Sequence, residues 1–383
     1  HYLSEINTLN VKKDSYEFVK LIVEGYSNNA KNGNAELPVI QKLINVPFGA
    51  DIEVSISKKE QIIISLSEYG IDNLIFPSQP SLSKSENAED VPFYFNEDYY
   101  DSNDFHSNEL VSTKILGKMR GQQLARLSVS PFKYNPTTNE LLITTKLEVN
   151  VKFKNIDFES HSSNISKYYS PHFNHLFKSS INYIPVQDKD LITTYPVKYV
   201  IVSDPSFQPA LQPLIDWKTK KGFNVIEAYT NDPLVGNSTS SIHAFIKDMY
   251  DNATLTDPAP TYLLIVGDDA QVPSFSGNSG SHLSDMYYCE FDGNGDFYPE
   301  MYFGRMSATN SGEVEIQVNK TLTYEQYTLA DPSYLDEIVL VAGVDAQMAP
   351  TYGNGQINYG TDNYFNIAHG LTIHNYLFLS TCC

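Results

Sequence analysis

The chain has few cysteines, few tryptophans and no long apolar run. Three of its 383 residues are cysteine and one is tryptophan, against 27 tyrosines. Three cysteines give no disulfide framework: Cys289 stands alone, and a bridge between the adjacent Cys382 and Cys383 would be strained. No run of 18 apolar residues occurs, so the sequence predicts no transmembrane helix, and we expect no membrane insertion.

Positive charge is also scarce. The chain has 46 acidic and 26 basic residues, a net charge of −20. A surface of that sign repels phosphate, so we expect no nucleic acid and no anionic membrane surface as a partner. The excess of acidic residues is concentrated after residue 194, where the chain has 22 acidic and 7 basic residues.

The length and the change of pattern along the chain predict several domains. The sequence starts with His1 and shows no signal peptide, so we expect a trimmed or partial chain. Residues 1–160 contain alternating strand patterns, such as Ile52, Val54 and Ile56, and few helix signals, which predicts an all-β, sandwich-like domain. Residues 161–194 are polar and predict an exposed linker, where a domain boundary and a proteolytic cut are expected.

From residue 195 to 383 the pattern alternates between strands and helices. The segments VKYVIVSD, FNVIEAY, TYLLIVGDD and DEIVLVAGVD predict strands, and Pro209 to Lys221 predicts a helix. Ser240 or Ser241 is expected to cap a second helix, and Asn310 with Glu313 forms a plausible capping box for a third. This alternation predicts a parallel α/β sheet with helices on both faces.

Three of these strands end in an acid, namely Asp204, Asp268 and Asp345. Ligands of open α/β sheets bind outside the carboxyl ends of the strands, so these acids are expected at the functional edge. For each acid taken alone, we favour the simpler interpretation that it caps the following turn or helix.

The loop from Asp292 to Glu300 spaces oxygen donors two residues apart. Asp292, Asp296 and Glu300 offer carboxylates and Tyr298 a main-chain carbonyl, a donor set that suits calcium. The loop is not an EF-hand, because Phe297 stands where that motif needs glycine and Phe303 where it needs glutamate. The competing interpretation is a solvated DGNG hairpin turn; we favour the cation.

No motif for a nucleophile is present in the chain. The surroundings of Cys289 are acidic and aromatic, so a buried structural cysteine is expected there. His369 and His374 lie in the same part of the chain as Cys382 and Cys383, but they form no recognisable dyad motif. GxSxG, HExxH, Walker and dinucleotide-binding motifs are absent.

Several segments, in order, resemble the gingipain-type cysteine peptidases. VKYVIVSD, LIDWKTKKGFNV, TYLLIVGDDAQVP, SDMYY and DGNGDFYPEMYFGRMS are similar to the first catalytic subdomain of that family. MRGQQLARLSVSPFKYNPTTNEL, from Met119 to Leu141, is similar to its prodomain. The resemblance extends from about Pro38 to the end of the chain.

The resemblance implies a caspase-like α/β catalytic domain behind a β-sandwich prodomain. It implies a secreted or cell-surface bacterial endopeptidase that acts on protein or peptide substrates through a cysteine thiolate, with histidine moving the proton. It further implies a zymogen that is activated by cleavage in the linker, residues 161–194, and whose own prodomain is an intramolecular inhibitor, with Lys118, Arg120 or Arg126 as the candidate substrate mimic. Calcium would be held by Asp292, Asp296, Tyr298 and Glu300.

Two departures from the family pattern shape the expectation. The family's catalytic histidine lies in a Gly-His-Gly motif, with the cysteine beyond it, and neither is found here; we therefore expect the dyad beyond Cys383 and an inactive polypeptide. Asn358 occupies the position where arginine-specific members place an aspartate, so it is the candidate substrate-binding residue. The alternatives are a secretion-pathway processing peptidase of the same family and a non-enzymatic, calcium-stabilised surface or adhesion protein.

Overall fold

A computed structural model describes residues 6–13, 16–81, 91–184, 196–254, 256–277, 282–293, 296–343 and 353–378. The chain forms two compact units, His1–Val314 and Glu315–Cys383. Within the first unit we distinguish a β-region, residues 6–184, from an α/β region, residues 196–314. The predicted Asp345, Cys382 and Cys383 lie outside the described residues.

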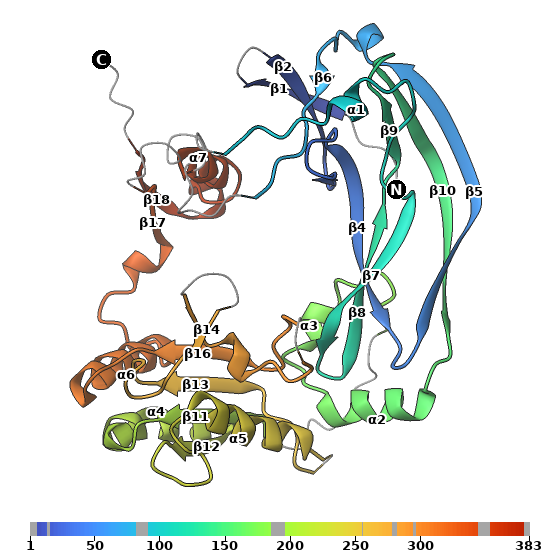
Figure 1. The fold of residues 1–383 in the computed structure, drawn as a ribbon. Coiled ribbons are helices and arrows are strands. Elements are labelled where there is room, and N and C mark those ends of the chain that lie inside the picture. The colour runs from blue at the N-terminus through green and yellow to red at the C-terminus, as the bar shows by residue number, and fades with distance from the viewer. Residues whose placement is uncertain are drawn as a thin grey trace. The chain divides into compact units, whose positions relative to one another are not determined.

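The β-region contains two facing antiparallel sheets and a smaller third sheet (Figure 1). The sheet orders are β3-β4-β8-β7, β5-β10-β9 and β1-β2-β6. The strands are β1 (Ile6–Lys13), β2 (Tyr16–Val23), β3 (Ser27–Asn29), β4 (Leu37–Val46), β5 (Asp51–Ser65), β6 (Leu74–Ile75), β7 (Val111–Met119), β8 (Gln122–Val129), β9 (Phe132–Asn135) and β10 (Glu140–Lys154), and the short helix α1 is Glu97–Tyr100.

Alternation of apolar side chains explains why the two larger sheets pack together. Val149, Val151 and Phe153 of β10 recur at every second position, so they lie on one face of their sheet. They share a core with Ile44 of β4 and Leu127 of β8 from the facing sheet. The predicted sandwich-like domain is confirmed.

The segment expected to be an exposed linker is partly helical. Helix α2 spans Phe158–Tyr168 and helix α3 spans Asn174–Phe177. Phe173 and Phe177 are buried, and the main-chain N–H of Ile181 donates to the carbonyl of Leu43 at 3.0 Å. Residues 158–184 are therefore tied into the fold, and the rest of the expected linker, residues 185–194, lies outside the described residues.

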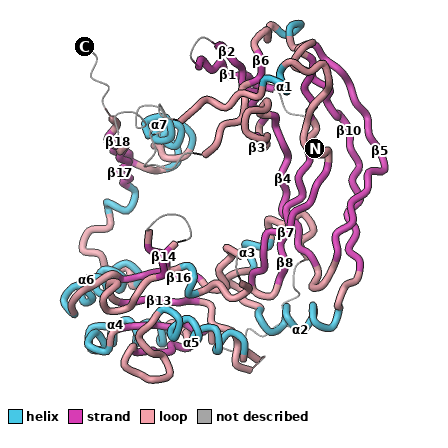
Figure 2. Tube along the Cα trace, in the orientation of Figure 1, coloured by secondary structure: helices cyan, strands magenta, loops and turns pink. Residues whose placement is uncertain are grey.

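The α/β region is built on a parallel sheet of order β12-β11-β13-β16 (Figures 1 and 2). Its elements, in chain order, are β11 (Lys198–Ser203), α4 (Gln208–Lys220), β12 (Asn224–Tyr229), α5 (Thr239–Asp251), β13 (Tyr262–Val266), a short hairpin of β14 (Phe275–Ser276) and β15 (Leu283–Ser284), and β16 (Tyr302–Met306). Helix α6 (Ser311–Glu325) follows and crosses the division between the two units.

Helices cover both faces of this sheet, as predicted. Val200 and Val202 of β11 pack with Ile242 and Ile246 of α5. The chain leaves β11 toward β12 and then crosses back to β13, and right-handed crossovers of opposite direction place α4 and α5 on opposite faces. The reversal of strand order lies between β11 and β13, where doubly wound sheets bind ligands at the carboxyl edge.

Two details of the sheet differ from the prediction. Strand β16, which contains the FGR segment, had not been predicted as a strand because Gly304 and Arg305 interrupt its apolar run. The DEIVLVAGVD strand, β17 (Glu337–Val341), pairs within the described residues with β18 (Thr372–Tyr376) and not with this sheet. The capping residue of α5 is Ser238 and not the predicted Ser240 or Ser241, and Ser241 completes the capping box.

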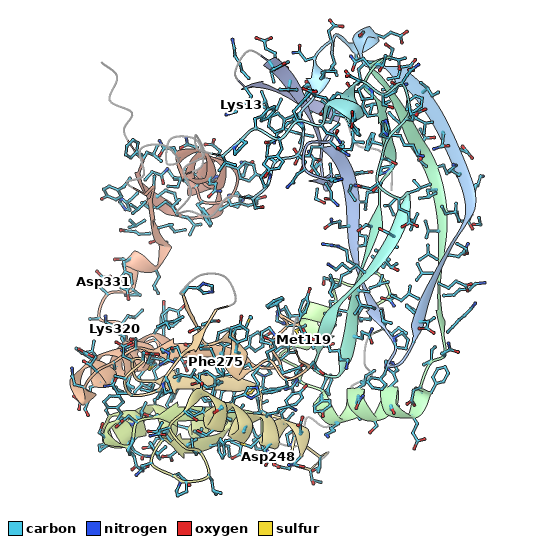
Figure 3. The ribbon with its side chains drawn as sticks, in the orientation of Figure 1. Lys13, Met119, Asp248, Phe275, Lys320 and Asp331 are labelled. Carbon is cyan, nitrogen blue, oxygen red and sulfur yellow. The ribbon has the colours of Figure 1, made fainter. Side chains whose placement is uncertain are left out.

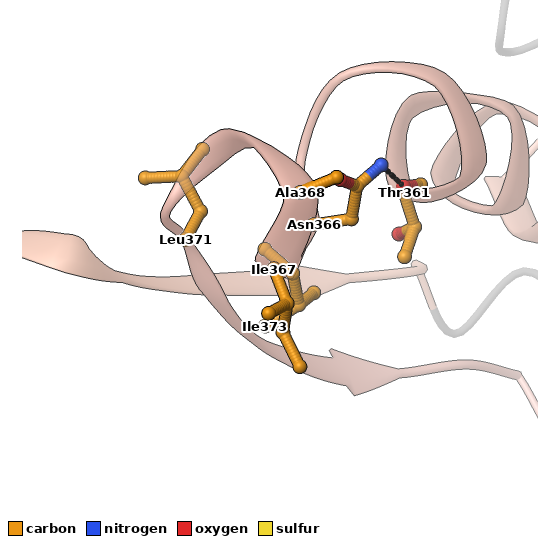
Figure 4. Close-up of a pocket in the computed structure, with 6 residues that line it drawn as sticks. All are labelled: Thr361, Asn366, Ile367, Ala368, Leu371 and Ile373. Carbon is orange, nitrogen blue, oxygen red and sulfur yellow. Dashed lines mark hydrogen bonds between the residues drawn. The ribbon is translucent and has the colours of Figure 1, made fainter.

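The second unit contains the parallel pair β17–β18 and helix α7 (Asn354–Asn363). An open, mainly apolar pocket of about 510 Å³ lies within this unit (Figure 4). Two of its lining residues are joined, because the side-chain amide of Asn366 donates to the carbonyl of Thr361 at 3.0 Å. The remaining lining residues are Ile367, Ala368, Leu371 and Ile373.

Candidate functional site

The carboxyl edge of the sheet carries two of the predicted acids, and both stabilise local turns. Asp204 caps the short 3-10 helix Pro205–Phe207, because its Oδ1 accepts the main-chain N–H of Ser206 at 2.9 Å. The Oδ1 of Asp268 accepts the main-chain N–H of Asp269 at 2.9 Å. The capping interpretation therefore holds for both acids.

Arg305 organises the loop that follows β13. Its Nη1 donates to the carbonyls of Gly267 and Val272, both at 2.8 Å. Its Nε and Nη2 donate to the carboxylate of Asp285 at 2.8 and 2.7 Å, and Nη2 also donates to Ser274 Oγ at 3.1 Å. The five N–H donors of the guanidinium are thus all used, and the loop is fixed next to the switch point. Sequence reasoning missed this residue, although a charge inside an apolar strand requires an acidic partner.

Cys289 is buried inside the α/β core, as predicted for a structural cysteine. The residue is fully inaccessible to solvent and packs among Tyr288, Met301 and other core side chains. Burial raises the pKa of its thiol, and the carboxyls of Glu300 and Asp285 raise it further. A thiol in this setting stays protonated and is a poor nucleophile.

The acidic loop brings its carboxylates to the amino edge of the sheet. Glu300 is fully buried just before β16. Its Oε2 accepts the Tyr250 hydroxyl at 2.6 Å, while its Oε1 has no hydrogen-bond partner among the described residues. Both oxygens of Asp296 accept main-chain N–H groups, from Tyr298 at 3.0 Å and from Lys118 at 2.7 Å.

These contacts decide how well the four predicted ligands suit a cation. Burial raises the pKa of Glu300 well above its usual range, and the neighbouring Asp292 carboxyl raises it further. A divalent ion between those two carboxyls would offset this unfavourable pairing and give the free Oε1 a partner. Asp296 would contribute less, because both of its carboxylate oxygens already accept main-chain N–H groups, and the role of Tyr298 stays a prediction. No group of three or more His, Cys, Asp or Glu side chains suited to a metal occurs in the described part of the chain.

The same loop receives the tip of a hairpin from the β-region. The tip, Gly117–Gly121, consists of the end of β7 and the two-residue turn, Arg120 and Gly121, that leads to β8. The main-chain N–H of Arg120 donates to Glu300 Oε2. The Lys118 ammonium lies 3.7 Å from Asp292 Oδ1, in a pair that is partly exposed. These contacts join the hairpin tip to the acidic loop, two segments that lie about half of the chain apart in the sequence.

The hairpin tip contacts the edge opposite the one where ligands of such sheets bind. Pro260, which accepts from Arg120 Nη1 at 2.7 Å, precedes β13, and Glu300 precedes β16. Both mark the amino ends of the strands. The idea that Lys118 or Arg120 imitates a substrate is therefore not supported, because both are engaged at the amino edge. Arg126 lies inside β8, and its buried Nε has no hydrogen-bond partner within the described ranges.

Asn358, the candidate substrate-binding residue, is exposed on helix α7 of the second unit. It does not line the pocket shown in Figure 4. Its assignment to substrate binding stays a prediction.

The first unit thus consists of a β-sandwich region held against a doubly wound α/β sheet. Residues 3–167 match the family model Propeptide_C25, and residues 192–376 match the model of peptidase family C25. The chain belongs to peptidase family C25 and includes the family's propeptide. This confirms the resemblance to the gingipain-type cysteine peptidases.

Individual relatives agree with this assignment. Lys-gingipain W83 of Porphyromonas gingivalis is 34% identical over 375 residues, which are 98% of this chain and 22% of that protein. Gingipain R2 of the same species is 24% identical over 367 residues, 93% of this chain and 46% of that protein. The chain thus spans about a fifth of the length of the Lys-gingipain.

A solved structure concerned with the zymogenic latency of gingipain K from Porphyromonas gingivalis is also similar. It is 32% identical and covers 40% of this chain and 84% of the solved one, with a TM-score of 0.38. No helix in the ranges that the structure describes is long and apolar enough to cross a membrane.

Proposed function

We propose that the full-length protein is a secreted or cell-surface cysteine endopeptidase that is made as a zymogen. The observation that supports this most is the hairpin tip of a propeptide-type β-region seated on a peptidase-type α/β sheet. In this proposal residues 6–184 are the prodomain and the intramolecular inhibitor. The substrates are proteins or peptides, attacked at a peptide carbonyl by a thiolate.

The proposed nucleophile is a cysteine other than Cys289. A catalytic thiol needs access to substrate and a positive environment that favours the thiolate. Cys289 has neither, because it is enclosed in the core and faces the carboxyls of Glu300 and Asp285.

Activation in this proposal begins with a cut between residues 184 and 196. A protease needs several residues of accessible, extended backbone. Helix α2, helix α3 and the hydrogen bond from Ile181 to Leu43 hold the preceding segment in place. The first cut is therefore expected beyond residue 184.

Peptide hydrolysis by the product of the complete gene tests the proposal. The precursor is assayed on fluorogenic peptides with lysine, arginine or a neutral residue before the cleaved bond. Each assay is run before and after the cut, with and without iodoacetamide. We expect hydrolysis that increases after the cut and disappears on alkylation. Absence of hydrolysis under every condition would favour the rival, a calcium-stabilised adhesion protein.

The same assay separates two roles within the family. A narrow preference for one peptide series, with no degradation of casein, would indicate a processing peptidase of the secretion pathway. Rapid degradation of casein as well would indicate digestion of bulk protein.

We also propose that calcium binds at the acidic loop, with Glu300 and Asp292 as the principal ligands. The support is the buried Oε1 of Glu300, which has no hydrogen-bond partner in the part of the chain that the structure describes and lies beside a second carboxyl. The test is the midpoint of thermal unfolding, measured with EDTA and with millimolar calcium. An increase with calcium that is absent in Glu300→Gln supports the proposal. An unchanged midpoint in the wild-type chain contradicts it.

A further inference from the structure

We propose that Arg120 is the residue by which the α/β region holds the β-region as a bound partner, and that this hold lies away from the catalytic edge. The inference rests on the proposed zymogen function, which it deepens by naming the contact. It explains how the prodomain stays bound to the α/β region. It does not concern how the prodomain prevents access of substrate to the catalytic edge.

The guanidinium of Arg120 is enclosed between the two regions. The residue is 2% exposed. Its Nη1 donates to the carbonyls of Pro260 at 2.7 Å and Glu300 at 3.2 Å, both in the α/β region. Its Nε donates to the carbonyl of Tyr168 in helix α2 at 2.8 Å. One side chain therefore joins three separate segments by their main chains.

Arg120 meets Glu300 twice. Its guanidinium donates to the carbonyl of Glu300, and its main-chain N–H donates to the carboxylate of the same residue. The backbone of Arg120 is left-handed, with φ of +51°, which is uncommon for a residue with a side chain. Arg120 and Gly121, whose φ is +71°, form the two-residue turn between the paired Met119 and Gln122, and such hairpin turns require a positive φ at both positions.

Aromatic side chains cover the guanidinium. Its central carbon lies 5.3 Å from the ring centroid of Phe173 and 5.5 Å from that of Tyr250. The Tyr250 ring also stacks on Tyr168, with centroids 4.4 Å apart. These rings exclude water and favour the cation through their π faces.

The rest of the hairpin tip is shaped for close approach. A Cβ on Gly117 would lie 2.4 Å from Asp296 Oδ1, and a Cβ on Gly121 would lie 2.8 Å from the ring of Tyr168. Met119, labelled in Figure 3, shares a cluster with Phe173 and Tyr302. The tip therefore fits the amino edge of the sheet through its backbone as well as through Arg120.

The contact is independent of the carboxyl edge. The hairpin tip bonds to residues that precede β13 and β16, whereas Asp204 and Asp268 follow the opposite ends of their strands. Loss of Arg120 should release the β-region without altering any residue at that edge.

The test uses the whole chain with a specific cleavage site inserted between residues 184 and 196. After the cut, dissociation of the two fragments is followed by dilution and analytical ultracentrifugation. The variants are Arg120→Ala and Arg120→Lys. Lys114→Ala is the matched control, because Lys114 is an exposed cation in β7, the strand that leads to the tip.

We expect the wild-type fragments and the Lys114→Ala fragments to stay together equally well. Arg120→Ala should weaken the complex by at least about 100-fold, because removal of a buried charged partner leaves its acceptors unpaired. Arg120→Lys keeps the charge but loses the forked geometry, so an intermediate loss is expected. Circular dichroism of the uncut variants checks that they fold.

Wild-type affinity in a folded Arg120→Ala or Arg120→Lys protein would overturn the inference. If Arg120→Ala does not fold, Arg120→Lys alone decides. Failure of the proposed function is a separate outcome: it would appear as absent peptide hydrolysis while the fragments still depend on Arg120.

Discussion

Arg120 and Glu300 lie 180 positions apart in the sequence and are joined by two hydrogen bonds. The main-chain N–H of Arg120 reaches the Glu300 carboxylate, and its guanidinium reaches the Glu300 carbonyl. The pair couples the β-region to the segment that positions the start of β16 and the acidic loop. A change on either side of this contact should therefore be measurable on the other.

Gly117→Ala should destabilise the uncut chain. The added Cβ would lie 2.4 Å from Asp296 Oδ1, so either the hairpin or the acidic loop must move. Overpacking of this kind costs about 1–3 kcal/mol. Urea unfolding measures the loss, with Gly304→Ala as the control, because a Cβ on Gly304 meets no atom within 4 Å. Equal stability of the two variants would contradict the close approach.

Arg305→Lys should destabilise the α/β region although the charge is kept. Lysine cannot make the paired hydrogen bonds to Asp285 and also reach the carbonyls of Gly267 and Val272. The expected loss is about 1–3 kcal/mol, because buried acceptors are left without a donor.

The control for Arg305→Lys is Lys154→Gln, which breaks the exposed pair with Glu53. Exposed pairs contribute about 1 kcal/mol or less, so this variant should change the free energy of unfolding little. A loss for Arg305→Lys no larger than for Lys154→Gln would show that the Arg305 network is not structural.

The stability of the metal-free protein should decrease as the pH rises above about 4.5. The pKa of Glu300 is raised in the folded state, so the folded chain binds more protons than the unfolded one in that range. Stability present below the unfolded pKa is then lost as the pH approaches the folded pKa. The slope is at most about 1.4 kcal/mol per pH unit for one group.

Urea unfolding in EDTA at several pH values measures this effect, and Glu300→Gln is the matched variant. As the pH increases, the free energy of unfolding of the wild type should decrease relative to that of Glu300→Gln. A pH-independent difference would mean that Glu300 does not titrate with folding.

Cys289 should resist labelling in the native protein. Its side chain is inaccessible and burial raises the pKa of its thiol, so iodoacetamide can react only after local opening. Mass-spectrometric mapping should find Cys289 modified at least about 100-fold more slowly in buffer than in urea. Rapid native labelling would reopen Cys289 as a candidate nucleophile.

Periodicity predicted the layered fold well, because side chains buried on regular elements leave a direct pattern in the sequence. The strands around Val200 and Leu263, the helix with Ile242 and Ile246, and the alternating Val149 and Val151 are all of this kind. The pattern does not predict strand β16, because Arg305 interrupts its apolar run. The charge of Arg305 is paired with Asp285, which lies 20 positions earlier in the sequence.

The candidate site was less predictable, because its key partner comes from the other region. The sequence indicated the acidic loop and the basic tip of the hairpin separately. Nothing in the spacing of Lys118 and Arg120 predicts that their main-chain N–H groups meet Asp296 and Glu300. Such a contact depends on the docking of two folded surfaces, which local patterns do not encode.

Hydrogen exchange at the hairpin tip tests the docked arrangement most directly. In the intact chain, the amides of Lys118 and Arg120 should be strongly protected, because both donate to buried carboxylates. In Glu300→Ala the Arg120 amide should exchange much faster, while amides inside β10 stay as slow as in the wild type. Rapid exchange of both tip amides in the wild-type chain would contradict the account.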